Sequence, residues 1–62
     1  MTKAQDALFA FGLGLELKAY EFCYDNAVSV RTADDHDVVR FDDNTEVKVY
    51  MNDDHEITIL EA

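Results

Sequence analysis

The chain has 62 residues, a formal net charge of −9 and a single cysteine, Cys23. A chain this short forms one domain with a small core, because it buries only about 60% of the surface that its unfolded form exposes. One cysteine excludes an intramolecular disulfide, and the acidic excess disfavours direct binding to nucleic acid or to an anionic membrane. We therefore expect one domain, residues 1–62, stabilised by a compact core or by self-association.

Most of the negative charge lies in the second half of the chain. Residues 1–31 carry four acidic and three basic side chains, whereas residues 32–62 carry ten acidic and two basic ones, a net charge of −8. A surface with this charge attracts a cation or a basic protein surface. We therefore expect a basic protein as the partner.

No membrane or targeting segment is expected. The apolar run at residues 7–15 is nine residues long, whereas a membrane span needs about 20. Asp6 lies where a signal peptide carries positive charge. We expect a cytoplasmic protein, acting in the host cell if the protein is viral, in which Cys23 is a small buried apolar residue.

The first third of the chain is predicted to be helical, over about residues 2–24. Thr2 and Gln5 have the spacing of a capping box at a helix start. A stripe with the helical period is expected to face the sheet: Ala4, Leu8, Phe11, Leu15, Ala19 and Phe22. A second stripe falls on nearly the opposite side: Phe9, Leu13, Leu17, Tyr20 and Tyr24.

Two interpretations of the second stripe remain open. In the first, the helix is continuous and this stripe forms a homodimer interface, where Gly12 and Gly14 allow two helices to approach closely. In the second, the helix ends near Gly12 and residues 13–20 form a strand with alternating apolar side chains. Leu, Glu, Lys and Ala are weak strand formers, which favours the continuous helix.

Four strands are predicted in the rest of the chain, at residues 27–32, 37–41, 46–51 and 56–60. Their alternation assigns one set of residues to the core: Val28, Val30, Val39, Phe41, Val47, Val49, Ile57 and Ile59. The other face receives Ser29, Arg31, Arg40, Glu46, Lys48, Glu56 and Thr58. Short connections predict hairpins with type I-based turns. The predicted fold is α+β, with one N-terminal helix on one face of a small antiparallel β-meander of three to four strands over about residues 27–61.

Acidic turns recur between these strands. Residues 33–41 are repeated as residues 52–60, each copy an acidic turn that leads into a strand, and a third acidic turn lies at residues 42–44. Loops of a meander alternate between the two ends of the sheet, so turns 33–36 and 52–55 are expected at the same end, about 10 Å apart. The third turn is expected at the opposite end.

Two clusters of carboxylates at this separation match the scale of DNA grooves, about 6 Å and about 12 Å wide. The sequence therefore predicts a small acidic inhibitor that occupies the basic, nucleic-acid-binding surface of a target protein, as a DNA mimic. Viral anti-CRISPR or anti-restriction proteins are of this general type, which is an analogy and not a family resemblance. The expected partner-binding residues are Asp34, Asp35, Asp37, Asp42, Asp43, Asp53, Asp54 and Glu56.

Other interpretations of the acidity and of the apolar helix stay open. The acidic turns are also typical of a protein that needs only solubility, or of one from a high-salt habitat. The aromatic N-terminal helix would suit a structural or assembly protein that forms homodimers without mimicry.

Metal binding is a further alternative, because His36 and His55 lie in the acidic turns. No spacing there matches a known zinc or calcium loop, and exposed turn histidines are the favoured interpretation. The chain also lacks a nucleophile motif and a phosphate-binding loop. We therefore expect no metal, no cofactor and no enzymatic activity.

Overall fold

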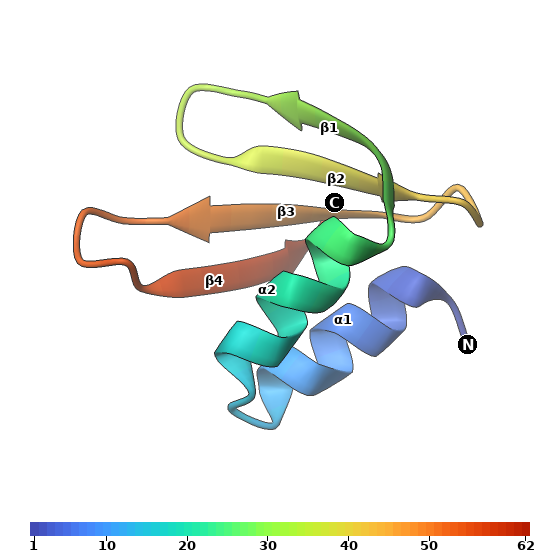
Figure 1. The fold of residues 1–62 in the computed structure, drawn as a ribbon, viewed down its shortest axis with the longest axis horizontal. Helices are drawn as coiled ribbons and strands as arrows, with labels where there is room; N and C mark the ends of the chain where they lie inside the picture. Colours follow the sequence, from blue (N-terminus) through green and yellow to red (C-terminus); the bar gives the residue numbers. More distant parts are fainter.

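Four strands form one antiparallel sheet, and two helices cover one of its faces (Figure 1). The computed structural model describes all 62 residues. The elements are α1 at Lys3–Gly12, α2 at Glu16–Asp25, β1 at Ala27–Thr32, β2 at Asp37–Phe41, β3 at Glu46–Met51 and β4 at Ile57–Glu61. The strands lie in the order β1-β2-β3-β4, each antiparallel to its neighbour. The predicted α+β fold with an antiparallel meander is confirmed.

The start of α1 is fixed by the predicted capping box. The Gln5 N–H donates to the Thr2 hydroxyl at 3.1 Å, and the Thr2 N–H donates to the Gln5 side chain at 3.0 Å. Both N–H groups lack a partner inside the helix, so the two side chains satisfy them reciprocally.

The N-terminal region forms two helices, and the prediction of one continuous helix is wrong. At the end of α1, the Gly14 N–H donates to the Phe11 carbonyl and the Leu15 N–H donates to the Ala10 carbonyl. Gly14 has a φ of 84°, which a residue without a Cβ adopts without strain. These contacts form a Schellman motif that ends the helix. The alternative interpretation is correct that the first helix ends near Gly12, but its strand at residues 13–20 is wrong, because α2 begins at Glu16.

The core lies between the helices and the sheet. Its ten buried residues are all apolar: Ala4, Ala7, Ala19, Cys23, Val39, Phe41, Val47, Val49, Ile57 and Ile59. Cys23 is buried as predicted, and burial raises the pKa of its thiol to about 11. The thiol is therefore neutral at physiological pH and unreactive. Neither helix is long and apolar enough to cross a membrane.

Strand β1 lies mostly outside the area that the helices cover. The helices pack mainly over β4 and β2 (Figure 1). As a result, the side chains of Val28 and Val30 are 57% and 43% exposed. The pairing of β1 with β2 also shifts register between Ala27 and Ser29. The prediction that Val28 and Val30 belong to the core is therefore wrong.

The β2–β3 and β3–β4 turns share one geometry. The Asn44 N–H donates to the Phe41 carbonyl, and the His55 N–H donates to the Asn52 carbonyl. The φ values of Asn44 and His55 are 67° and 62°. A type I turn followed by a left-handed residue is a common three-residue hairpin loop. The predicted type I-based turns are confirmed at these two positions.

Replacing His55 by glycine is expected to stabilise the protein by about 0.5–1 kcal/mol, because a left-handed conformation costs an L-residue about 1 kcal/mol or more. Urea unfolding followed by circular dichroism measures the difference. Asp54→Gly is the control, since the φ of Asp54 is not positive, and it should lower stability. Equal losses of stability for the two variants would contradict the assignment of strain to His55.

Candidate partner-binding site

Two acidic turns lie at the same end of the sheet (Figure 1). Turn 33–36 joins β1 to β2, turn 52–56 joins β3 to β4, and turn 42–45 lies at the opposite end. Because the two strand pairs are offset by two positions in the sheet, turns 33–36 and 52–56 lie about 10 Å apart across it. The predicted assignment of the three turns to the two ends of the sheet is confirmed.

The two turns are stepped along the strand direction. Asp37 at the start of β2 pairs with Val49, whereas β3 continues to Met51. Turn 52–56 therefore extends about two residues, roughly 7 Å, beyond turn 33–36. We call the carboxylates of these two turns the acidic rim: Asp34, Asp35, Asp53, Asp54 and Glu56.

The repeated sequence gives two turns of different geometry. In turn 52–56, the Asn52 side-chain oxygen accepts from the N–H groups of Asp54 at 3.0 Å and Glu56 at 2.9 Å. Ala33 occupies the equivalent position in turn 33–36 and has no side chain that can do this. That turn is closed by the Ala33 N–H, which donates to the His36 carbonyl at 2.8 Å.

The rim carboxylates differ in whether they have partners within the protein. Asp34, Asp53 and Asp54 are exposed and form no ion pair within the protein. Asp35 lies 2.7 Å from the His36 ring, and the hydrogen bond from that ring lowers the pKa of Asp35. Glu56 accepts from the Asn52 side-chain amide at 2.8 Å. Three of the five rim carboxylates are therefore without a partner in the protein.

Asp37 is half-buried and lies on the helix side of the sheet. Its Oδ2 accepts from the Tyr24 hydroxyl at 2.7 Å, which ties α2 to β2. Burial and this hydrogen bond raise the pKa of Tyr24, so its hydroxyl stays protonated and remains the donor. Asp37 therefore lies beside the acidic rim, but its side chain contacts Tyr24 on α2.

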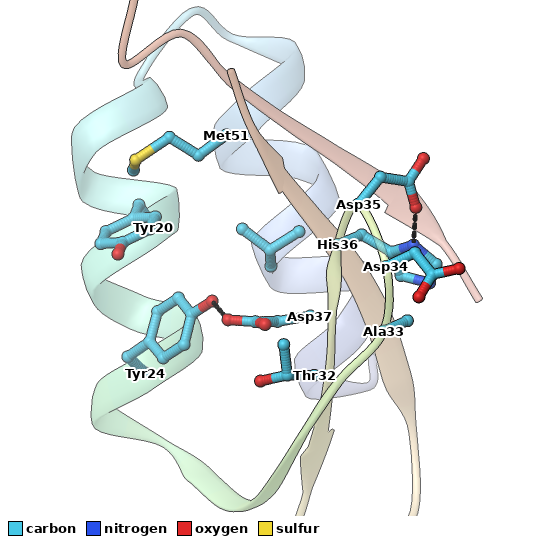
Figure 2. Close-up of a pocket in the computed structure, with 10 residues that line it drawn as sticks. Tyr20, Tyr24, Thr32, Ala33, Asp34, Asp35, His36, Asp37 and Met51 are labelled. Atoms are coloured by element: carbon cyan, nitrogen blue, oxygen red, sulfur yellow. Dashed lines mark hydrogen bonds and ion pairs between the residues drawn. The ribbon is translucent and has the colours of Figure 1, made fainter. Parts of the chain in front are cut away.

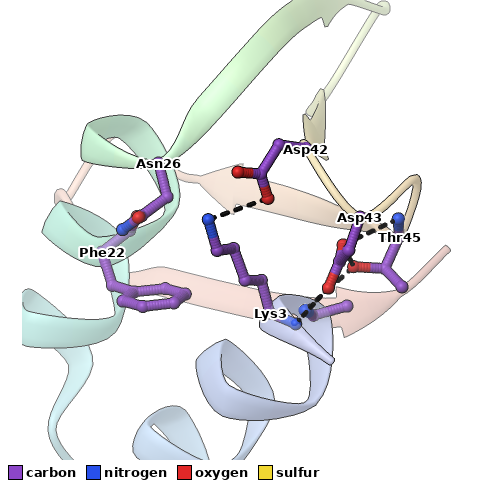
Figure 3. Close-up of polar contacts among 7 residues, drawn as sticks. Lys3, Phe22, Asn26, Asp42, Asp43 and Thr45 are labelled. Carbon is purple, nitrogen blue, oxygen red and sulfur yellow. Dashed lines mark hydrogen bonds and ion pairs between the residues drawn. The ribbon is translucent and has the colours of Figure 1, made fainter. Parts of the chain in front are cut away.

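Asp42 and Asp43 lie at the opposite end and hold α1 against the sheet (Figure 3). The Asp43 carboxylate accepts from the Lys3 N–H at 2.8 Å and from the Thr45 N–H at 3.1 Å. Asp42 forms an ion pair with the Lys3 ammonium at 2.8 Å. A carboxylate at a helix N-terminus satisfies free N–H groups and interacts favourably with the helix dipole. The structure thus does not bring these two predicted residues together with the others.

Asp43 is expected to make stability depend on pH in acid. Hydrogen bonds from the Thr45 hydroxyl and the Lys3 N–H lower the pKa of Asp43. Its contribution is therefore present above the pKa of the unfolded chain, about 4, and is lost as the pH falls below that value. Asp43→Asn should lower the thermal midpoint at neutral pH and flatten its decline in acid.

Thermal unfolding between about pH 7 and about pH 2, followed by circular dichroism, measures this effect. Asp42→Asn is the matched control, because an exposed ion pair contributes little. Identical pH profiles for the wild type and Asp43→Asn would contradict the capping role.

The residues of the second helical stripe do not share one continuous helix. Phe9, Leu13 and Leu17 gather around the α1–α2 junction and are 63%, 61% and 64% exposed. Tyr20 and Tyr24 are half-buried along α2, with ring centroids 4.7 Å apart. A dimer interface of all five residues stays a prediction, and only the first three are free to contribute most of their apolar surface.

The two histidines occupy different environments. His36 is largely buried by Tyr50, with ring centroids 4.9 Å apart, so its expected exposure is wrong, whereas His55 is exposed. No three His, Cys, Asp or Glu side chains lie close enough together to hold a metal ion. The metal-binding alternative therefore gains no support from the geometry.

A cavity that the sequence did not suggest lies beside the acidic rim. Tyr20, Tyr24 and Met51 line it together with Asp37. The sequence pattern placed the two tyrosines on a dimer stripe and gave Met51 no role. The i, i+4 spacing of the tyrosines was the available signal, because it places both rings on one side of a helix.

Comparisons of the chain with protein-family models, with curated protein sequences and with solved structures find no match.

Proposed function

We propose that the protein binds the basic, nucleic-acid-binding surface of a partner protein and excludes nucleic acid from it. The principal support is the position of turns 33–36 and 52–56, side by side at one end of the sheet. Across about 10 Å, with a step of roughly 7 Å, the acidic rim can face two rows of basic side chains that otherwise hold phosphates. An anti-CRISPR or anti-restriction inhibitor would act in this way.

The electrostatics favour fast, salt-sensitive association. The separation of the two turns is comparable to the Debye length, about 10 Å at 0.1 M salt, so both turns attract the same basic patch. Carboxylates paired with arginine and lysine contribute more to association rate and specificity than to affinity. Hydrogen bonds of Asn52 hold turn 52–56 in one geometry. A turn ordered in advance loses less conformational entropy on binding.

Titration against basic nucleic-acid-binding proteins tests the proposal. Isothermal titration calorimetry at about 0.05 M and about 0.5 M salt should give a complex that weakens as salt rises. An acidic protein without such turns controls for non-specific attraction. If no candidate forms a salt-sensitive complex stronger than that control, the proposed function is wrong.

Self-association is a second candidate function, favoured by the exposure of Phe9, Leu13 and Leu17 around the α1–α2 junction. Burying such side chains against a second copy would add about 25 cal/mol for each Å² of apolar surface removed from water. Sedimentation equilibrium gives the solution mass. A dimer that Leu17→Glu converts to a monomer would support this candidate, whereas a monomeric wild type would remove it.

A further inference from the structure

A cavity of about 330 Å³ lies between α2 and the end of the sheet that carries turn 33–36. We call it the tyrosine cavity. Figure 2 shows Tyr20, Tyr24, Met51 and Asp37 around the hollow, while the side chains of Asp34, Asp35 and His36 lie on the other side of the turn. The complete lining is Tyr20, Tyr24, Thr32, Ala33, Asp34, Asp35, His36, Asp37, Val49 and Met51. The lining contains neither a lysine nor an arginine.

Several polar atoms of the tyrosine cavity have no partner in the protein. Asp37 uses only Oδ2 to accept from Tyr24, which leaves Oδ1 free. The hydroxyls of Tyr20 and Thr32 form no side-chain hydrogen bond, and no buried side-chain oxygen or nitrogen is left unsatisfied. The free oxygens of Asp37 and Tyr20 are therefore in contact with solvent, and both residues line the cavity, where a ligand can reach them. A carboxylate oxygen accepts only, so it selects a donor, and most strongly a cationic one.

The walls of the cavity suit a flat cation. The rings of Tyr20 and Tyr24 lie 4.7 Å apart at an interplanar angle of 46°, and the face of a tyrosine ring attracts a cation that lies within about 6 Å of its centre. Met51 adds a flexible thioether wall. A guanidinium group is planar, stacks on aromatic rings and has five N–H donors, whereas an ammonium group is compact and more strongly hydrated.

We propose that the tyrosine cavity binds the guanidinium group of an arginine side chain on the partner protein. The guanidinium stacks on the ring of Tyr20 or Tyr24 and donates to Asp37 Oδ1. The cavity adjoins turn 33–36. When an arginine of the partner enters the cavity, basic side chains next to that arginine therefore face the acidic rim. This inference rests on the proposed function for the identity of the partner, but the cavity can be tested without that partner.

The probe is N-acetyl-arginine methylamide, added to the ¹⁵N-labelled protein and followed by two-dimensional NMR. The expected result is saturable shifts of the amide signals of Tyr20, Tyr24, Thr32, Asp37 and Met51. The citrulline analogue has nearly the same shape without the charge, and it should cause shifts only at concentrations about tenfold higher or more. No shifts at the cavity, or equal shifts with citrulline, would overturn the assignment.

Variants separate the cavity from the acidic rim. Asp37→Asn keeps an oxygen that accepts from Tyr24 but removes the charge, and Tyr20→Leu removes one ring; each should weaken binding about tenfold. Glu61→Gln also removes one negative charge, at an exposed position outside both the cavity and the acidic rim, and should leave the affinity for the probe unchanged. Amide signals far from each substitution report whether the fold is retained. If Asp37→Asn binds the probe as tightly as the wild type does, or if Glu61→Gln weakens binding as much as Asp37→Asn does, the cavity is not the site.

The two proposals fail separately. If the protein shows no salt-sensitive binding to basic proteins, the proposed function is wrong, whether or not the probe binds to the cavity. Absence of probe binding would remove the arginine cavity and leave the acidic rim unaffected.

Discussion

Phe41→Ala is expected to lower the free energy of unfolding by about 3–5 kcal/mol, the usual cost of removing a buried phenylalanine. The Phe41 side chain is fully buried, and its ring centroid lies 5.9 Å from that of Phe22 on α2. The ring therefore fills the space between the sheet and the helices. A domain of this size has a total stability of about 3–9 kcal/mol. The variant should accordingly lose a large part of its stability.

Urea unfolding followed by far-ultraviolet circular dichroism measures this effect. Phe41→Leu leaves a smaller cavity than Phe41→Ala. If Phe41→Ala does not fold, the loss of stability can still be measured for Phe41→Leu. Phe9→Ala is the matched control, because the Phe9 side chain is 63% exposed and its removal should change stability by less than about 1 kcal/mol. A larger loss for Phe9→Ala than for Phe41→Ala would mean that the core is not organised around the sheet as described.

Neutralising the acidic rim is expected to slow association with a basic partner about tenfold or more at low salt. The variant carries Asp34→Asn, Asp35→Asn, Asp53→Asn and Asp54→Asn, which changes the net charge from −9 to −5. The lost carboxylates are those nearest the partner in the proposed complex. Stopped-flow or surface plasmon resonance measurements give the association rate at several salt concentrations.

The matched control removes the same number of charges from the other half of the chain. It carries Asp6→Asn, Glu16→Gln, Glu21→Gln and Asp25→Asn, all of them at exposed positions in the helices. If only net charge matters, both variants should associate equally slowly. If the acidic rim is the contact surface, the control should keep most of the wild-type rate and its salt dependence.

Much of the sheet was predictable because its signals are local. The alternation of apolar residues predicted all four strands, with a difference of one residue at each end of β4. Short connections imply a meander, and a meander alone places turns 33–36 and 52–56 at the same end. The capping box of Thr2 and Gln5 predicted the start of α1. Each of these features depends on residues that are neighbours along the chain.

The end of α1 near Gly12 agrees with the alternative interpretation and not with the favoured continuous helix. Gly14 lies after a helical run, where a glycine commonly adopts the left-handed conformation that ends a helix. The favoured interpretation treats Gly12 and Gly14 as sites where two helices approach closely. It therefore continues the helical period of 3.6 residues past the end of α1. The residues of the second stripe therefore lie on two helices, α1 and α2, and on the connection between them.

Other features depend on how elements meet and have no local signal. Val28 and Val30 alternate like core residues, but the helices are displaced toward β4 and leave β1 uncovered. The hydrogen bonds from Lys3 to Asp43 and from Tyr24 to Asp37 join residues on different elements. They decide which carboxylates are engaged within the fold and which remain in the acidic rim, and charge counting along the sequence cannot make that distinction.

The most direct test of the account is competition between this protein and duplex DNA for a basic partner. The labelled protein is bound to the partner at low salt, and unlabelled duplex DNA is added while fluorescence anisotropy reports the bound fraction. If the protein occupies the nucleic-acid-binding surface, DNA displaces it completely, and the apparent affinity of the protein for the partner falls in proportion to the DNA added. A stable complex that contains the protein, the partner and DNA together would contradict it.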